Sequence, residues 1–301
     1  MFRRNFLKKS VLSLGAFVPL YRSLNNYLYN NDARNRPIKI SLNAYSFNNY
    51  LQSGEMDLED LLKYCSKLTF DALDPTGYYF PNYPEVPVNE YIYKIKRKAF
   101  IHGLEISGTG IRNNFTDPDP AKRRADLNHI KKWVQVASKL GAPVIRVFAG
   151  REIPKGYSRN EINGWIVKAL KECVEYGKAH GVMIGVQNHN DYLKNADQVL
   201  EILRLVNSDW LGIILDVGSF STKNPYDDIA RLAPYAISWQ IKENLGYQDR
   251  TVKTDLSKIV QILKDVDYRG YIPIETLGGD PMVKVPRFLQ EVRGALGYFD
   301  D

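Results

Sequence analysis

The feature that most constrains this chain is a repeated alternation of short apolar runs with longer amphipathic stretches. Eight short apolar runs, rich in β-branched residues, begin near Ile38, Phe70, Leu104, Pro143, Val182, Leu211, Ala236 and Tyr271. Such runs predict strands that are buried on both faces, and their alternation with helices predicts a parallel sheet. Eight units in about 265 residues match the usual barrel size of about 250 residues. The sequence therefore predicts an α/β fold, a (β/α)8 TIM barrel, over residues 37–301.

Helical patterns lie between the apolar runs, over residues 58–68, 89–102, 121–140, 161–180 and 196–206. Three of them end at a glycine that can adopt the left-handed capping conformation, Gly103, Gly141 and Gly181. Asp57, and either Ser158 or Asn160, precede helices as N-caps do. A doubly wound open sheet would need a glycine-rich phosphate turn after its first strand. Residues 41–45 have no glycine, so the barrel is favoured.

The charge distribution separates the first 36 residues from the rest of the chain. The net charge is +7, but residues 1–36 hold a surplus of six positive charges and the remainder holds only one. The barrel part of the chain therefore lacks the excess of positive charge that is typical of nucleic-acid-binding domains. Cys65 and Cys173 lie in helical patterns and offer neither metal-ligand spacing nor a disulfide framework. We expect both in the core.

The basic N-terminal segment resembles a twin-arginine export signal. Arg3 and Arg4 are followed by a hydrophobic pair and by Lys8. The apolar segment 11–20 is shorter than the roughly 20 residues of a membrane span, so a signal peptide is favoured. No clear A-x-A cleavage site follows, so the signal could be removed or could remain as a membrane tether. The alternative to a signal peptide is a basic tail of a cytosolic protein. We expect a signal peptide and linker over residues 1–30, the twin-arginine export machinery as a partner, and a periplasmic location.

Polar side chains stand at the carboxyl ends of the last four predicted strands. Gln187, Asp216, Gln240 and Glu275 each close or nearly close an apolar run. Residues at these strand ends converge on one mouth of a barrel, where barrel enzymes do their chemistry. An unpaired carboxylate there would cost several kcal/mol in desolvation. A cation or a donor must compensate it, and oxygen ligands suit Mg²⁺ or Mn²⁺, while a salt bridge within the barrel rim is the structural alternative.

These strand ends also carry a family resemblance. Residues 215–218 (Leu-Asp-Val-Gly), 239–243 (Trp-Gln-Ile-Lys-Glu) and 274–275 (Ile-Glu) resemble the strand-end motifs of the xylose isomerase-like sugar isomerase/epimerase superfamily. In that family Glu, Asp, His and Glu from strands 5 to 8 hold a divalent metal. The resemblance implies a metal site formed by Gln187, Asp216, Gln240 and Glu275. The sequence departs from the family at the two glutamines, although related 3-dehydroshikimate dehydratases also have glutamine at the third position.

The departure at Gln187 affects the expected proton chemistry. Tagatose 3-epimerase-like members use two glutamates on opposite faces of the substrate, and an amide cannot accept a proton as a glutamate does. Glu275 then remains as a single base, with His189 or Lys242 as a second proton carrier. Lys242 lies two residues after Gln240, so both side chains point to the same face of the strand. An inward lysine can stabilise an enolate oxygen or form a salt bridge with a barrel carboxylate.

Candidate substrate-binding residues lie at or just after predicted strands. They are Tyr45, Arg112, Arg146, Phe148, Asn188 and Trp239. Aromatic rings offer broad contact to the C–H faces of a sugar, although core packing is the alternative for at least half of the aromatic residues. The long loop 74–87 and the polar segment 109–114 are expected to wall the pocket. Phosphorylated substrates are not expected, because Gly278 and Gly279 alone are weak evidence for a phosphate cradle.

The sequence thus predicts a metal-dependent isomerase or epimerase that acts on a non-phosphorylated sugar or keto-sugar. The reaction would proceed by proton abstraction next to a carbonyl, through a metal-stabilised enediolate. Two alternatives stay open: a lyase or dehydratase that performs β-elimination on a keto-sugar or glycoside, and a non-catalytic barrel that has lost its metal and binds carbohydrate. A small carbohydrate is the expected ligand, and nucleic acid is not. The oligomeric state, a homo-oligomer included, stays open.

Overall fold

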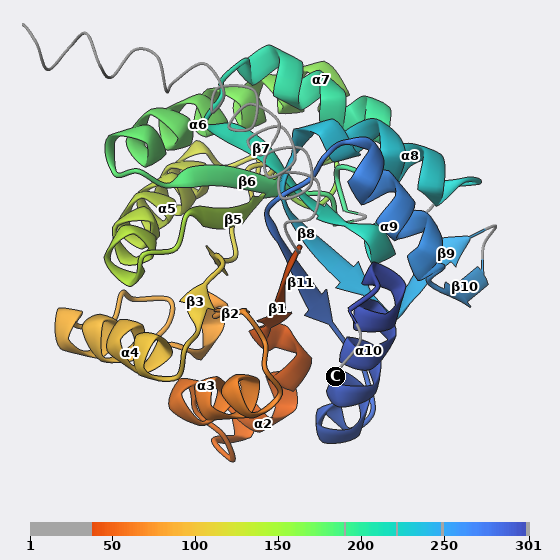
Figure 1. Cartoon of the computed structure of the whole chain (residues 1–301). Helices are drawn as coiled ribbons and strands as arrows, with labels where there is room; N and C mark the ends of the chain where they lie inside the picture. The colour runs from red at the N-terminus through yellow and green to blue at the C-terminus, as the bar shows by residue number, and fades with distance from the viewer. Residues whose placement is uncertain (1–37, 190, 221, 248–249, 299–301) are drawn as a thin grey trace, which may run out of the picture. The chain divides into compact units, whose positions relative to one another are not determined.

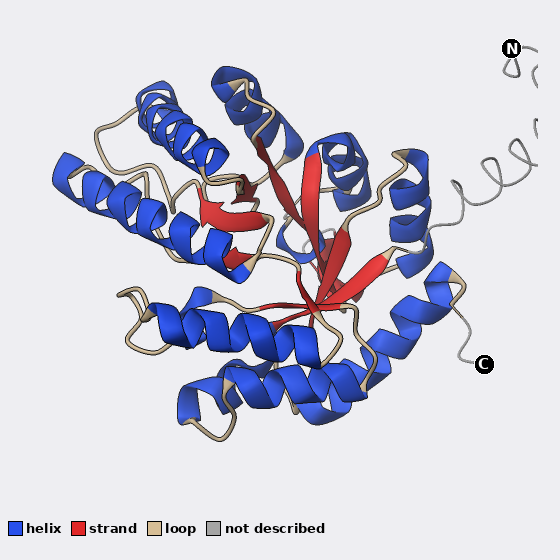
Figure 2. Ribbon diagram, turned by 60° about the vertical axis from the view of Figure 1, so that its left-hand side comes forward, coloured by secondary structure: helices blue, strands red, loops and turns tan. Residues whose placement is uncertain are grey.

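The fold is an eight-position parallel β-barrel surrounded by helices (Figures 1 and 2). The computed structural model describes residues 38–189, 191–220, 222–247 and 250–298. The barrel strands are β1 (Lys39–Asn43), β2 (Ala72–Asp74), β3 (Glu105–Ile106), β4 (Thr109–Gly110), β5 (Val144–Phe148), β6 (Met183–Gln187), β7 (Leu211–Asp216), β8 (Ala236–Lys242) and β11 (Tyr271–Glu275). They begin within a few residues of the predicted runs, and the predicted (β/α)8 fold is confirmed.

The strand order in space closes the barrel. Every neighbouring pair is parallel, in the order β3-β2-β1-β11-β8-β7-β6-β5-β4. The first and last strands pair with Lys39 opposite Tyr271. The third barrel position is split, because β3 pairs with β2 whereas β4 pairs with β5. A bridge between Thr76 and Gly110 joins the two sides at this split. All strand carboxyl ends therefore face the same mouth.

Helices cover the outside of the barrel, as the two views show (Figures 1 and 2). They are α2 (Asn48–Ser53), α3 (Leu58–Lys67), α4 (Asn89–Ile101), α5 (Pro120–Leu140), α6 (Arg159–Ala179), α7 (Ala196–Val206), α8 (Pro225–Leu232), α9 (Leu256–Asp265) and α10 (Pro281–Leu296). Short 3-10 turns lie at Ala44–Phe47, Gly77–Tyr79, Val217–Ser219 and Ala233–Tyr235. Asp57 caps α3, as the sequence predicted. Of the two candidates Ser158 and Asn160, Ser158 caps α6, and it forms a capping box with Glu161.

The core lies between the strands and this ring of helices. Strand residues are buried in nearly continuous runs, as in β7, where only Leu211 keeps partial exposure. Both cysteines, Cys65 and Cys173, are buried in helix faces that pack inward, as expected. The helical glycine Gly177 lies so close to the carbonyl oxygen of Val182 that an added Cβ would lie 2.4 Å from it. Helix α6 can therefore approach the start of β6 only because this position has no side chain.

Two features lie outside the sequence predictions or outside the described residues. An antiparallel hairpin of β9 (Asn244–Tyr247) and β10 (Arg250–Lys253) follows β8 and stands beside the mouth. The alternating apolar pattern of this segment is too short to have predicted it. The twin-arginine segment falls within residues 1–37, which lie outside the described residues. Among the described residues, no helix combines the length and the hydropathy needed to cross a bilayer.

Candidate active site

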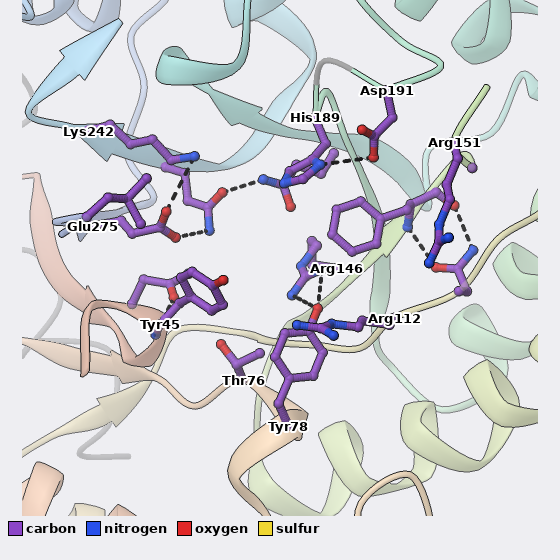
Figure 3. A pocket seen from close by; sticks show the side chains of 17 residues that line it. Tyr45, Thr76, Tyr78, Arg112, Arg146, Arg151, His189, Asp191, Lys242 and Glu275 are labelled. Carbon is purple, nitrogen blue, oxygen red and sulfur yellow. Dashed lines mark hydrogen bonds and ion pairs between the residues drawn. The ribbon is translucent and has the colours of Figure 1, made fainter. Parts of the chain in front are cut away.

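A cavity of about 450 Å³ opens at the carboxyl ends of the barrel strands. Its lining combines residues from most of the strand ends and from the loops that follow them (Figure 3). They are Asn43, Tyr45, Thr76, Tyr78, Arg112, Asn113, Arg146, Phe148, Gly150, Arg151, Gln187, His189, Asp191, Gln240, Lys242, Glu275 and Leu277. This is the end of the barrel where the strand-end residues were expected to meet.

The four strand-end residues Gln187, Asp216, Gln240 and Glu275 form one hydrogen-bonded chain. The Gln187 Nε2 donates to Asp216 Oδ2 at 2.8 Å and to Gln240 Oε1 at 2.5 Å. The Gln240 Nε2 donates to Glu275 Oε2 at 2.9 Å. All four side chains are at most 5% exposed. The structure thus brings together residues that are up to 88 positions apart, counted from Gln187 to Glu275.

Lys242 places a positive charge between the two carboxylates. Its Nζ lies 2.8 Å from Asp216 Oδ2 and 3.3 Å from Glu275 Oε1. Burial disfavours the ammonium form, but the neighbouring carboxylates outweigh that cost and raise the pKa of Lys242 above its usual value. Lys242 is therefore a fixed cation at the mouth, and both carboxylates are compensated inside the protein.

Asp216 is held in place from several directions. The Gly218 backbone N–H donates to Asp216 Oδ1 at 3.0 Å, and the Ser219 hydroxyl donates to Oδ2 at 2.7 Å. Asn188 bonds to the backbone of Asp216 in both directions, as donor at 2.8 Å and acceptor at 2.9 Å. Asp216 thus has a fixed orientation, and its carboxylate accepts four hydrogen bonds when those from Gln187 and Lys242 are included.

Glu275 is the buried carboxylate that lines the cavity. Burial raises the pKa of Glu275 above its usual value, the Lys242 ammonium lowers it in part, and the charge of Asp216 raises it further. A third strand-end carboxylate, Asp74 at the end of β2, lies in the same electrostatic network. Burial raises the pKa of Asp74 to about 6, with a further rise from Glu275 and an opposing effect of Arg146. Two acids with raised pKa values therefore belong to this end of the barrel.

His189 enters the cavity from the loop after β6. Its Nδ1 lies 3.0 Å from Asp191 Oδ2, and its ring packs edge-on against Phe148 at a centroid distance of 5.0 Å. The side chain is 46% exposed, so water reaches it freely. Figure 3 shows His189 and Glu275 entering the cavity from different sides. The contact with Asp191 orients the imidazole ring toward the cavity side of the loop.

The structure places most of the predicted site residues at the cavity, with two corrections. Tyr45, Arg112, Arg146 and Phe148 line it, as do the predicted proton carriers. Trp239 was wrongly predicted to contact substrate: it is fully buried and packs edge-on against Tyr268 at 5.9 Å. Its neighbour Gln240 faces the mouth, and adjacent strand residues face opposite sides. Asn188 is also fully buried and holds the Asp216 backbone, so it is a positioning residue and not a substrate contact.

Sequence reasoning missed two charged residues of this region, Asp74 and Arg151. The signal for Asp74 was available, because Ala72-Leu73-Asp74 ends in a carboxylate just as Leu215-Asp216 does. Arg151 follows Gly150 in the loop after β5 and lines the cavity. No apolar periodicity marks its loop, so the sequence offered no comparable signal for it. Its position depends on the contacts of that loop with the segment after β4.

Comparisons with known proteins agree with this geometry. The sequence profile described as "Xylose isomerase-like TIM barrel" matches residues 62–292. The chain belongs to this family. The match includes all four strand-end residues and Lys242. No curated protein matches the sequence.

Solved structures similar to this family member include several sugar epimerases. A D-tagatose 3-epimerase-like protein is 21% identical, with a TM-score of 0.70, over 86% of this chain and 98% of that one. The 3-keto-D-glucoside 4-epimerase YcjR of E. coli is 13% identical, with a TM-score of 0.67, over 79% and 94%. The IolI protein with a bound zinc atom is 16% identical, with a TM-score of 0.70, over 88% and 100%. At these identities the likeness establishes the fold.

The donor set of this xylose isomerase-like barrel does not fit a divalent metal. Two of the four residues at the expected ligand positions are amides whose N–H groups point into the cluster, toward Asp216 and Glu275. The Lys242 ammonium binds both remaining carboxylates and would repel a second cation. Among the described residues, no group of three His, Cys, Asp or Glu side chains is arranged to hold a metal ion. The charge that a metal would supply is present as Lys242.

Proposed function

We propose that this protein is a sugar isomerase or epimerase that moves a proton at the carbon next to a carbonyl. The observation that carries the proposal is the contact of a buried base with a fixed cation: Glu275 Oε1 lies 3.3 Å from Lys242 Nζ at the floor of an open cavity. Family membership and the epimerase folds that resemble this chain support the same class of reaction. The proposed substrate is a sugar or keto-sugar without a phosphate group.

Glu275 has the properties of the base that removes the proton. The pKa of Glu275 is raised toward neutral pH, and a general base works most efficiently when its pKa lies near the working pH. The Gln240 amide donates to Oε2, and the other oxygen, Oε1, contacts the Lys242 ammonium. Glu275 lines the cavity. The proton that Glu275 takes from one carbon can be returned to the adjacent carbon, while the hydroxyl proton passes to the former carbonyl oxygen. This completes an isomerisation with one shuttling base.

Lys242 supplies the positive charge for the oxygen of the intermediate. When the proton leaves, negative charge develops on the former carbonyl oxygen, and a preorganised cation stabilises it in a site with little water. The Lys242 side chain is only 12% exposed and is held by two carboxylates. It therefore loses little conformational entropy when it binds the oxygen of the intermediate. In this proposal the ammonium does what the sequence resemblance assigned to a divalent metal, and a metal-dependent version would require Lys242 to leave both carboxylates.

Epimerisation needs a second proton carrier on the other face of the substrate. Gln187 cannot take that role, because its amide does not accept a proton. His189 is the residue that fits, since it enters the cavity from the loop after β6 and is backed by Asp191. A reaction that depends on both Glu275 and His189 would be an epimerisation, whereas one that depends on Glu275 alone would be an isomerisation.

A second cavity favours a lyase as the alternative. It has a volume of about 390 Å³, lies against the β9–β10 hairpin and shares Lys242, Glu275 and Leu277 with the first cavity. A substrate of two units could place one unit in each cavity, with the bond between them near Glu275. Proton abstraction by one base followed by β-elimination would then release one unit. A keto-glycoside is the substrate class for this alternative.

The experiment is C–H exchange in heavy water, followed by NMR, with a panel of aldoses, ketoses, 3-keto-glycosides and sugar acids. Exchange reports proton abstraction without any assumption about the product. We expect Glu275→Gln to reduce exchange by about a hundredfold or more, while Glu175→Gln on the exposed face of α6 leaves it unchanged. Exchange that continues at the original rate in Glu275→Gln would contradict the role of Glu275. No exchange with any member of the panel would favour the non-catalytic carbohydrate-binding barrel.

A further inference from the structure

The charges of the main cavity are separated into two walls. The wall formed by β7, β8 and β11 holds Asp216 and Glu275, which share the single ammonium of Lys242. The opposite wall, formed by β5 and the loops after β4 and β5, holds three guanidinium groups, those of Arg112, Arg146 and Arg151. Among the described residues, none of these three guanidinium groups has a carboxylate within the ion-pair distance of 4.0 Å. The first wall therefore combines two carboxylates with one ammonium, whereas the guanidinium groups of the second wall have no ion pair in direct contact.

Arg146 is buried in this positive wall, with 8% of its surface exposed. Its guanidinium donates to the Tyr78 hydroxyl from both terminal nitrogens at 3.0 Å and to the Ile111 carbonyl oxygen at 3.2 Å. These acceptors are uncharged, and the carboxylates of Asp74 and Glu275 interact with the guanidinium only from beyond ion-pair distance. A Cβ on Gly110 would lie 2.6 Å from Arg146 Nε, so the chain keeps a glycine where the guanidinium needs the space. A buried charge without a close counter-ion is costly, and an anion would offset that cost.

Arg112 is held at the rim by its neighbours. Its guanidinium carbon lies 4.5 Å from the centroid of the Tyr78 ring, and its backbone N–H donates to the Tyr83 hydroxyl at 3.1 Å. The next residue, Asn113, exchanges two hydrogen bonds with the Phe148 backbone, at 2.7 and 2.8 Å. Within the described part of the chain, the guanidinium of Arg112 itself donates to no protein acceptor. This guanidinium can therefore donate to a ligand, and the loop that bears it is anchored to β5.

Arg151 is anchored to the same segment from the other side. Its backbone N–H contacts Asn114 Oδ1 at 3.3 Å and Thr116 Oγ1 at 3.1 Å. Gly150 approaches Thr116 so closely that a Cβ would lie 2.4 Å from Cγ2 of that threonine. The backbones of the two loops that bear Arg112 and Arg151 are thus held together, and an ordered loop loses less entropy when a ligand binds.

We propose that the substrate is an anionic sugar whose carboxylate binds to Arg112 and Arg151 in the field of Arg146. Its carbonyl end would face Glu275 and Lys242 across the cavity. The planar guanidinium fork matches the two oxygens of a carboxylate. Aldonic, uronic and keto-sugar acids belong to this class. The inference deepens the proposed function and rests on it only for the position of the reacting end.

A carboxylate fits better than a phosphate at this barrel mouth. Barrel enzymes often bind phosphate at the loops after strands 7 and 8 and at the N-terminus of a short helix. Here the helix that follows the last strand, α10, is capped by Asp280, whose carboxylate accepts the Met282 backbone N–H at 2.9 Å. Pro281 at the first helical position has no N–H to offer. The cap is therefore already occupied by an acid that would repel a phosphate.

The test is isothermal titration of the full chain with matched pairs of sugar acid and sugar amide. The pairs are D-glucuronate with D-glucuronamide and D-galacturonate with D-galacturonamide, with D-gluconate, D-glucose 6-phosphate and D-galactose 6-phosphate as single probes. We expect at least one acid to bind about tenfold or more tightly than its amide, and this preference to shrink as sodium chloride is raised. Equal affinity within every pair, or binding by no acid, would overturn the proposal. Tighter binding of either sugar phosphate than of every acid would overturn the choice of carboxylate.

The variants Arg112→Met and Arg151→Met locate the anion. Both residues are exposed and lie in loops, and methionine keeps the length of the side chain without its charge. Each change should weaken binding of the acid about tenfold and leave the amide unaffected. Arg204→Met, at the end of α7 that precedes β7 and thus at the opposite end of the barrel, changes the net charge equally and should leave both affinities unchanged. Equal losses in all three variants would overturn the assignment to this wall.

The binding test and the exchange test can fail separately. Acid-selective binding without C–H exchange on any sugar would support the anionic ligand and contradict the isomerase proposal. Exchange on neutral keto-sugars without acid-selective binding would support the isomerase and overturn the anionic substrate. The two results are measured on the same protein, each with its own set of compounds.

Discussion

Gly218 and Lys242 fit together because the glycine has no side chain. A Cβ on Gly218 would lie 2.5 Å from Cδ of Lys242 and 3.0 Å from the carbonyl oxygen of Asn244. The lysine side chain passes over this glycine to reach Asp216, which stands two residues before Gly218 in the chain. The segment Leu215–Gly218 therefore supplies one of the two carboxylates and also the space for the cation that bridges them.

Gly218→Ala should displace the Lys242 ammonium and lower the rate of C–H exchange by about ten- to a hundredfold. The loss of one preorganised group that stabilises a developing oxyanion has an effect of this order. The rate is measured by NMR in heavy water with the best substrate of the panel. Gly294→Ala is the matched control, because no atom lies within 4 Å of the added Cβ in the last turn of α10. It should keep full activity and gain about 0.5–1 kcal/mol of stability. Full activity in Gly218→Ala would contradict the role of Lys242.

The pH dependence of exchange should report Glu275. The base must be ionised, so the rate falls as the pH decreases through a pKa that lies above the usual value of 4.5. Lys242→Met removes the charge that lowers this pKa, and the acidic limb of the profile should move to higher pH. A limb that stays in place in Lys242→Met would show that the two groups are not coupled.

Lys242→Met should also change the stability of the fold. The variant leaves two buried carboxylates without a counter-charge, which costs about 3–5 kcal/mol near neutral pH. The pKa of Glu275 in the folded variant is then raised further above its unfolded value. The folded state is favoured when the group is protonated, so the variant is most stable below the unfolded pKa and loses stability as the pH rises through the folded pKa. Urea unfolding from pH 4 to pH 8 measures this loss, and a flat profile would contradict it.

Asp74→Asn should stabilise the protein above pH 6. Burial raises the pKa of Asp74 to about 6 from 3.8, so the folded protein loses stability as the pH rises from about 4 to about 6 and the buried carboxyl ionises. Asparagine has no such ionisation, and at pH 7 we expect a gain of at most about 3 kcal/mol. The gain should vanish below pH 4. Asp209→Asn, outside the barrel mouth, is the control, and an equal gain in both variants would exclude Asp74 as the cause.

Removal of divalent metals should leave the reaction unaffected. Lys242 already binds Asp216 and Glu275, so EDTA treatment is expected to change the exchange rate by less than twofold. The metal content of the purified protein, measured by mass spectrometry, should be well below one equivalent. One tightly bound equivalent together with loss of exchange in EDTA would instead support a metal-dependent site in which Lys242 has moved aside.

The sequence determined the fold and the positions of the strand ends. The eight apolar runs and the caps at Asp57 and Ser158 are local signals, because burial and hydrogen bonding of a segment depend mainly on its own residues. Gln187, Asp216, Gln240 and Glu275 could be placed at one mouth because parallel strands of a barrel all end on the same side. The alternation of strand side chains also put Lys242 on the same face as Gln240. The same rule, applied to Trp239, would have placed that ring in the core.

Only the tertiary structure decided what the strand-end residues do to one another. The sequence left Lys242 as an enolate partner or a salt bridge, and the structure shows its ammonium between Asp216 and Glu275, where the resemblance had implied a metal. The positive wall of Arg112 and Arg151 depends on contacts between two irregular loops, which carry no periodic signal in the sequence. Charge–charge contacts and cavities arise from distances of a few ångströms between segments far apart in the chain. Local sequence patterns fix the elements, and the packing of those elements fixes such distances.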